Sequence, residues 1–177
     1  MNNLFKNAIN FYEKKEYDKA KKVCEDILDI QPDDLNATNL LAILNFHNKD
    51  FVQSIKFFEK AIEINPNISE TYNNLGNVYY EFKQFNLAIE NYNTALKIKP
   101  NFALSYYNRA KALQEINQKQ EAISDYDKAI SINNNFSAAY KNLGNLYMEL
   151  KILDKSIYNH VQALKINPNM SYLNGTI

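Results

Sequence analysis

Apolar residues recur along the chain with the spacing of one face of an α-helix, and short polar turns separate these segments. Leu75, Val78, Tyr79 and Phe82, for example, stand at i, i+3, i+4 and i+7. The pattern predicts five pairs of amphipathic helices. The first helices are expected near residues 2–15, 35–48, 69–82, 103–116 and 137–150, and the second helices near 18–30, 52–64, 86–98, 120–132 and 154–166.

The helix pairs repeat with a period of 34 residues. Pro32, Pro66 and Pro100 are 34 residues apart, Pro168 follows after 68 more, and Asn134 stands midway between the last two. Proline lacks the backbone N–H and disfavours helix in the residue before it, so each proline is expected to end a second helix. A fixed period of this length is typical of stacked helical repeats. Short polar residues after these positions suit N-caps of the next helices: Asp33, Asp34, Asn67, Asn101 and Asn135.

Small and large side chains occupy fixed positions within the repeat. Small residues predict close helix contacts, and large apolar or aromatic residues fill the remaining space. The small set, at positions 8, 20 and 27, is Ala8, Ala42, Gly76, Ala110, Gly144, Ala20, Ser54, Ala88, Ala122, Ser156, Ala61, Ala95, Ala129 and Ala163, with Ile27 as the exception. The large set, at positions 4, 11 and 24, is Leu4, Tyr72, Tyr106, Tyr140, Phe11, Tyr79, Leu113, Tyr147, Phe58, Tyr92 and Tyr126.

These residues resemble the tetratricopeptide repeat family, most plainly in Tyr72-Asn-Asn-Leu-Gly-Asn-Val-Tyr79, Ala88-Ile-Glu-Asn-Tyr92, Ala95 and Pro100. The resemblance covers residues 1–170. It implies an all-α fold, a right-handed superhelical solenoid of five helix-turn-helix repeats with ten helices. The expected repeats are 1–34, 35–68, 69–102, 103–136 and 137–170, which form a single array, and residues 171–177 form a short C-terminal tail.

The charge balance and the apolar pattern exclude several classes of partner. The chain has 20 Lys and Arg against 20 Asp and Glu, so its net charge is zero and no basic stripe is available for nucleic acid. No apolar run is long enough for a signal peptide or a membrane span, so we expect a soluble, cytoplasmic protein. The single cysteine, Cys24, stands at an aromatic position and is expected to be a small buried hydrophobe.

The sequence predicts no catalytic site, metal site or cofactor. The two histidines, His47 and His160, lie in different repeats and have no partner at the spacing of zinc ligands. His160 stands at an aromatic packing position, which favours a core or half-buried role. Gly76 and Gly144 lie within helices, so neither belongs to a glycine-rich phosphate loop. Arg109, the only arginine, stands at a packing position and is expected to pack through its stem.

The first helices are expected to line a concave groove that binds a peptide or a partner protein. Asparagine stands at position 6 in the last three repeats, and an amide both donates to and accepts from the backbone of an extended peptide. An alternative interpretation is that the chain is rich in asparagine everywhere, and both interpretations stay open at this point. Two tyrosines add apolar contact area, and lysines bias the choice of peptide. The candidate peptide-binding residues are Asn39, Asn73, Asn74, Asn77, Tyr80, Tyr107, Asn108, Lys111, Lys141, Asn142 and Asn145.

Two further interpretations concern the context of the array. The motif Asn74-Leu-Gly-Asn77, its copy at residues 142–145 and the end Tyr172-Leu-Asn-Gly-Thr-Ile177 are similar to O-linked N-acetylglucosamine transferases and SPINDLY-like proteins. That resemblance implies the substrate-binding arm of a glycosyltransferase whose catalytic domain lies outside this chain. Because few residues follow the fifth repeat, we also expect a fragment or an array that continues elsewhere. The apolar side of the last helix (Ile157, Val161 and Leu164) is then partly exposed and supports self-association.

Overall fold

A computed structural model describes residues 2–168, and the helices of this part of the chain confirm the predicted fold class. Every predicted helix is present, and its ends lie within two residues of the predicted ends. The predicted tail, residues 171–177, lies outside the described residues. The described helices are α1 (Asn2–Glu13), α2 (Tyr17–Ile30), α3 (Leu35–His47), α4 (Phe51–Ile64), α5 (Ser69–Glu81), α6 (Phe85–Ile98), α7 (Ala103–Glu115), α8 (Lys119–Ile132), α9 (Ser137–Glu149) and α10 (Leu153–Ile166).

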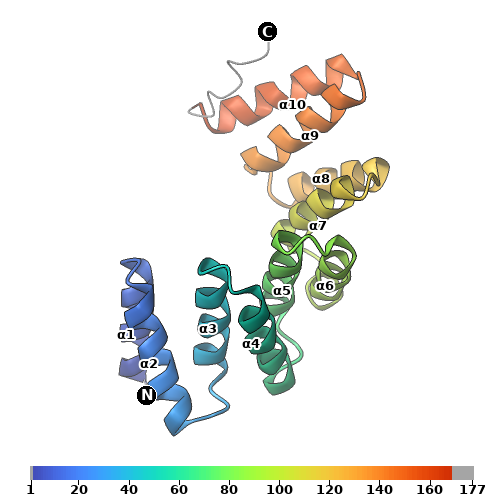
Figure 1. The fold of residues 1–177 in the computed structure, drawn as a ribbon. Helices are drawn as coiled ribbons and strands as arrows, with labels where there is room; N and C mark the ends of the chain where they lie inside the picture. The colour runs from blue at the N-terminus through green and yellow to red at the C-terminus, as the bar shows by residue number, and fades with distance from the viewer. Residues whose placement is uncertain (1, 169–177) are drawn as a thin grey trace. The chain divides into compact units, whose positions relative to one another are not determined.

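Two compact units divide the chain, residues 1–98 and residues 99–177, and each is described by itself. In both units the two helices of each repeat pack side by side (Figure 1). In unit 1, α2 also contacts α3, and α5 contacts both α3 and α4; in unit 2, α8 contacts α9. The prediction that residues 1–170 form one array stays a prediction.

A residue in the left-handed backbone region ends the first helix of every repeat. In the second repeat Lys49 has a φ of 59°, its N–H donates to Phe46 O, and the N–H of Asp50 donates to Asn45 O. This pair of bonds is the Schellman arrangement, which satisfies carbonyl groups that the end of a helix leaves without partners. The left-handed residues are Lys15, Lys49, Lys83, Asn117 and Lys151, again 34 residues apart.

The predicted N-caps are only partly correct. Asp34 caps α3, because its side chain accepts a hydrogen bond from the N–H of Ala37 at 2.9 Å. The asparagines that precede the later first helices do not cap them: the N-cap residues of α5, α7 and α9 are Ile68, Phe102 and Phe136, without a side-chain cap bond. Each asparagine lies one residue before the N-cap, too early to reach the first free N–H groups.

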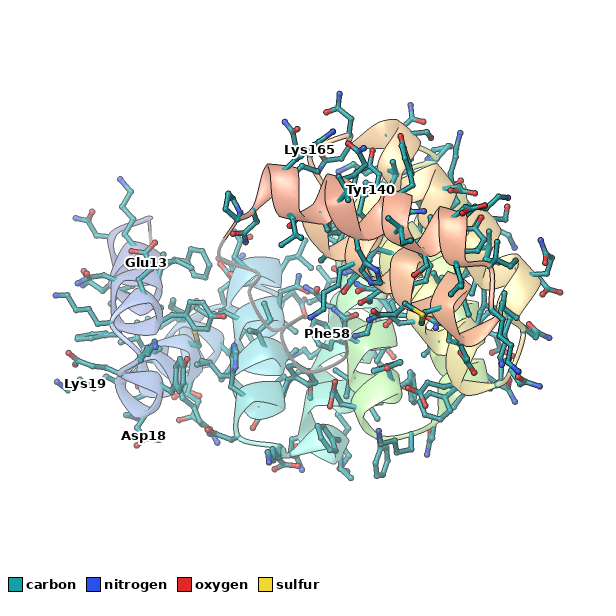
Figure 2. The ribbon with its side chains drawn as sticks, turned by 90° about the horizontal axis from the view of Figure 1, so that it is seen from above. Glu13, Asp18, Lys19, Phe58, Tyr140 and Lys165 are labelled. Carbon is teal, nitrogen blue, oxygen red and sulfur yellow. The ribbon has the colours of Figure 1, made fainter. Side chains whose placement is uncertain are left out.

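The core follows the predicted register of small and large residues. The small residues at positions 20 and 27 are buried, and where serine replaces alanine its hydroxyl donates to a backbone carbonyl of the first helix, Ser54 to Ala42 and Ser156 to Gly144. Phe58, Tyr92 and Tyr126 at position 24 are fully buried; Phe58 is labelled in Figure 2. At position 4 the side chains are less buried than expected, because Leu4 is exposed and the three tyrosines are half-buried.

Candidate functional site

A pocket of about 230 Å³ lies on the face that the first helices present in unit 1. We call the corresponding face of each unit its first-helix face: α1, α3 and α5 in unit 1, α7 and α9 in unit 2. The pocket walls are mainly apolar and aromatic, and two asparagine amides stand at one side. The lining residues are Tyr12, Ile43, Phe46, His47, Phe58, Asn74 and Asn77.

An aromatic cluster of the first two repeats forms one wall of this pocket. The rings of Tyr17 and His47 stack with centroids 5.2 Å apart and planes 6° apart. The hydroxyl group of Tyr12 lies 2.9 Å from Nε2 of His47, so a hydrogen bond joins α1 to α3. Burial raises the pKa of Tyr12, with a smaller contribution from Tyr17, so the hydroxyl keeps its proton. Three side chains from two repeats therefore hold this wall in place.

A hydrogen bond from the core fixes the amide of Asn77 on the opposite side. The hydroxyl group of Tyr92, in α6, donates to Asn77 Oδ1 at 2.8 Å. Because the oxygen is the acceptor, the Nδ2 group is left to donate, and among the described residues it donates to no protein acceptor. The amide is thus oriented before any ligand arrives, which lowers the entropy lost on binding.

Gly76 makes room for the ring that holds Asn77. A Cβ at Gly76 would lie 2.5 Å from Cε1 of Tyr92. Repeat five has the same arrangement: a Cβ at Gly144 would lie 2.9 Å from the ring of His160, and Nε2 of His160 donates to Asn145 Oδ1 at 2.9 Å. In repeat four the hydroxyl of Tyr126 instead donates to Gln114, which stands at position 12, about one helical turn beyond position 9. Alanine stands at position 8 of this repeat. Glycine thus coincides with the repeats in which the position-24 side chain bonds asparagine at position 9.

The other candidate residues of unit 1 lie around the pocket. Asn39 donates to Leu35 O and accepts from the hydroxyl group of Thr71, so it links α3 to α5. Asn73 is buried, with 2% of its surface exposed, and donates to Asn74 Oδ1 at 3.5 Å. Tyr80 is half-buried and packs edge-on against Phe85. The structure therefore brings Asn74 and Asn77 into the pocket and places Asn39 and Asn73 mainly in contacts within the protein.

The candidate residues of unit 2 form a second group. Asn142 donates to the hydroxyl group of Tyr107 at 3.1 Å and links α9 to α7, and Lys111 Nζ lies 6.0 Å from the Tyr107 ring centroid. Asn108 is buried and Asn145 is exposed, where it accepts the bond from His160. Burial lowers the pKa of His160 below 6.5, with a smaller contribution from Lys141. His160 is thus half-buried, as predicted, and is neutral at pH 7.

The asparagines thus act largely as links within and between repeats. Apart from Phe58, which the sequence predicts as a core residue, four pocket residues were not among the predicted binding residues: Tyr12, Ile43, Phe46 and His47. Their place in the repeat could have indicated them, because they stand at positions 9, 12 and 13 of the first helices, the helices that are expected to line the groove. Most of the predicted binding residues lie in repeats three to five, whereas the pocket lies mostly in repeats one and two.

Arg109 forms an ion pair. Its guanidinium group donates to both carboxylate oxygens of Asp125 at 2.6 Å and lies 5.4 Å from the Tyr106 ring centroid. Asp125 is buried, with 6% of its surface exposed. At position 7, where Arg109 stands in the fourth repeat, repeats two, three and five hold the buried leucines Leu41, Leu75 and Leu143, and repeat one holds Asn7. The expected stem packing missed this bidentate pair.

Within residues 2–168, no group of three or more His, Cys, Asp or Glu side chains is placed to hold a metal ion. No helix in that part of the chain has the length and apolarity needed to cross a membrane.

The repeated helix pairs define an all-α repeat protein, and comparison with known families identifies which one. Four models of tetratricopeptide repeats match residues 5–67, 57–90, 76–117 and 103–136. The chain belongs to the tetratricopeptide repeat family. No curated protein sequence matches it.

Solved structures of similar fold cover nearly the whole chain. MamA 41-end from Desulfovibrio magneticus RS-1 is 16% identical, with a TM-score of 0.83, and the match covers 96% of each chain. PilF of Pseudomonas aeruginosa is 15% identical, with a TM-score of 0.87, over 94% of this chain and 76% of that one. YrrB, described as a TPR protein with an unusual peptide-binding site, is 17% identical, with a TM-score of 0.73, over 94% and 86%. At these identities the likeness shows the fold.

Proposed function

We propose that the chain is a protein-interaction scaffold that binds an extended peptide of a partner protein on its first-helix faces, without catalytic activity of its own. The observation that supports this function best is the pocket of unit 1, in which apolar walls meet the preset amide of Asn77. Binding sites combine an apolar surface with a few fixed polar groups in this way. YrrB, of similar fold, is described as having a peptide-binding site.

The chemistry of the two faces suits a peptide backbone. An amide Nδ2 group donates to a peptide carbonyl whatever side chain follows, and the aromatic wall adds contact area. The residues proposed to bind are Asn74, Asn77, Tyr80 and the four missed pocket residues in unit 1, and Tyr107, Asn108, Lys111, Lys141, Asn142 and Asn145 in unit 2. Asn39 and Asn73 are proposed to support them through their contacts. The proposed location is the cytoplasm.

A peptide selection followed by NMR tests the proposal. Random 12-residue peptides displayed on phage are selected on the immobilised chain, and the selected peptides are titrated into isotope-labelled protein. We expect chemical-shift changes at first-helix residues such as Ile43 and Asn77, with second-helix residues such as Glu59 and Lys60 unchanged as internal controls. Failure to select any peptide, or changes confined to the second helices, would refute peptide binding by the first-helix faces.

The glycosyltransferase interpretation stays a prediction from the sequence. The proposed junction, residues 172–177, lies outside the described residues, and the structural matches concern the repeat fold. Reading the gene beyond the codon for Ile177 tests it, since a continuing frame that encodes a catalytic domain would support it and a stop codon would refute it. Self-association also stays a prediction; on α10, Ile157 is 60% and Val161 41% exposed.

A further inference from the structure

The pocket of unit 1 has the size of one large side chain. An apolar cavity of about 150 Å³ holds a benzene molecule, whereas sites for drug-sized ligands start at about 300 Å³. At about 230 Å³, this pocket has room for an aromatic or branched aliphatic group. Its lining includes the fully buried Phe58 and the apolar side chains of Tyr12, Ile43 and Phe46.

The positions of the first helices that are expected to face the groove, positions 2, 5, 6, 9, 12 and 13 of the repeat, carry a net negative charge in unit 1. In the first three repeats these positions carry three carboxylates (Glu13, Glu70 and Glu81) and one ammonium (Lys6), a net charge of −2. The same positions of repeats four and five, in unit 2, carry two lysines (Lys111 and Lys141) and two glutamates (Glu115 and Glu149), a net charge of zero. The first-helix face of unit 1 is therefore the one that attracts cations.

Glu81 is the carboxylate best placed to act beside the pocket. It is exposed and follows Asn77 by four residues, one helical turn along the same face of α5. Burial raises the pKa of Tyr92, and Tyr80 and Glu81 add smaller contributions, which places Glu81 in the electrostatic field of the hydroxyl group that holds Asn77. The nearest lysine along the chain, Lys83, has its ammonium group 5.8 Å from the centroid of the Phe85 ring.

From this arrangement we infer that unit 1 binds a peptide segment in which one large apolar side chain enters the pocket and a lysine or arginine within two residues of it faces Glu81. One helical turn is about 5.4 Å, and two residues of an extended peptide span about 6.6 Å, so the two contacts match this spacing. The amides of Asn74 and Asn77 donate to the carbonyl groups between them. The inference rests on the proposed function and adds the chemical class of the peptide.

A charge exchange tests it. Peptides from the same phage selection are sequenced, and one that carries the apolar–basic pair is labelled for fluorescence anisotropy with the full chain. We expect Glu81→Lys to weaken binding by roughly fivefold at low salt, an effect that fades at high salt. Replacing the peptide's lysine with glutamate should weaken binding to the native chain, and Glu81→Lys should restore it. Glu115→Lys, at the same repeat position in unit 2, is the matched control and should leave the affinity unchanged.

A second variant tests the pocket itself. Ile43→Ala enlarges the pocket and removes apolar contact, so we expect it to weaken the peptide with the native anchor about tenfold, and to have little effect once the peptide's anchor is alanine. Circular dichroism of each variant shows whether the helices persist. Selected peptides that lack an apolar–basic pair, or that bind Glu81→Lys and Ile43→Ala as well as the native chain, would overturn the inference and leave the proposed function standing. Failure to select any peptide would instead overturn the proposed function.

Discussion

Gly76 offers a quantitative test of how the core sets the binding amide. In Gly76→Ala the new Cβ would lie 2.5 Å from Cε1 and 2.8 Å from Cδ1 of Tyr92. Carbon atoms in contact prefer about 3.5–4.0 Å, so the ring must move by about 1 Å. Tyr92 has 1% of its surface exposed, and its hydroxyl is bonded to Asn77, so a shift disturbs both the packing and that bond.

The expected loss of stability follows from three terms. Overpacking a core costs about 1–3 kcal/mol, and weakening the Tyr92–Asn77 bond costs up to about 1 kcal/mol. Alanine restores about 1 kcal/mol of helix propensity that glycine lacks. The net expectation is a decrease of about 0–3 kcal/mol in the free energy of unfolding, with a midpoint of about 1.5 kcal/mol. Gly144→Ala should cost less, because the ring that it meets belongs to the half-buried His160, which can move toward solvent.

Urea unfolding followed by circular dichroism measures these values, with the slope checked because repeat arrays depart from two-state behaviour. A double-mutant cycle with Asn77→Ala isolates the coupling: once the acceptor is gone, Gly76→Ala should cost less than it does alone. If Gly76→Ala is as stable as the native chain, the ring does not need the glycine. If the two changes are additive, the proposed link between glycine, tyrosine and asparagine is wrong.

Three further predictions concern other buried groups. Asp125→Ala should lower the free energy of unfolding by about 1–3 kcal/mol, because it leaves the guanidinium group of Arg109 without its carboxylate. Replacement of both residues by leucine should cost less than the sum of the two single leucine replacements, as measured by urea unfolding. His160 has a pKa below its unfolded value of 6.5, so its contribution to stability is present above pH 6.5 and is lost as the pH falls through the folded pKa. His160→Gln should therefore reduce the difference between the free energies of unfolding at pH 7.5 and pH 5.5. An unchanged difference would contradict this prediction. Cys24 is buried, and burial raises its pKa to about 12, so a thiol reagent should modify it only as fast as the first repeat opens; modification as fast as that of the unfolded chain would show that the thiol is accessible.

The sequence predicted the fold well because its signals are local and repeated. Proline at position 32 follows the second helix in four of the five repeats, and Asn134 stands there in the fourth. Small residues at positions 8, 20 and 27 fix which faces pack, so the helix bounds follow to within two residues. The left-handed turn at position 15 was missed although it has the same period. Its residue is lysine in four repeats, and lysine carries none of the conformational preference that glycine would have signalled.

The candidate site was predicted less well because the residue types alone do not show which side chains bond to one another. Asparagine at position 9 looked like a ligand for peptides, but its oxygen accepts a bond from the position-24 side chain of the same repeat, Tyr92 in one case and His160 in another. No pattern within one helix reveals that partner, which lies 15 residues away on the second helix. The pocket likewise depends on Tyr12 and His47, which are 35 residues apart and meet only after two repeats have packed.

The left-handed lysines of the turns have a consequence for engineering. Glycine adopts a positive φ without the steric penalty of lysine, so replacing Lys49 or one of its equivalents should relieve local strain in that repeat alone. Each repeat has one such turn, and the turns lie outside the positions that line the first-helix faces. The effects of several replacements on stability should therefore add. Substitution of this one residue thus changes the stability of a single repeat while the binding residues stay the same.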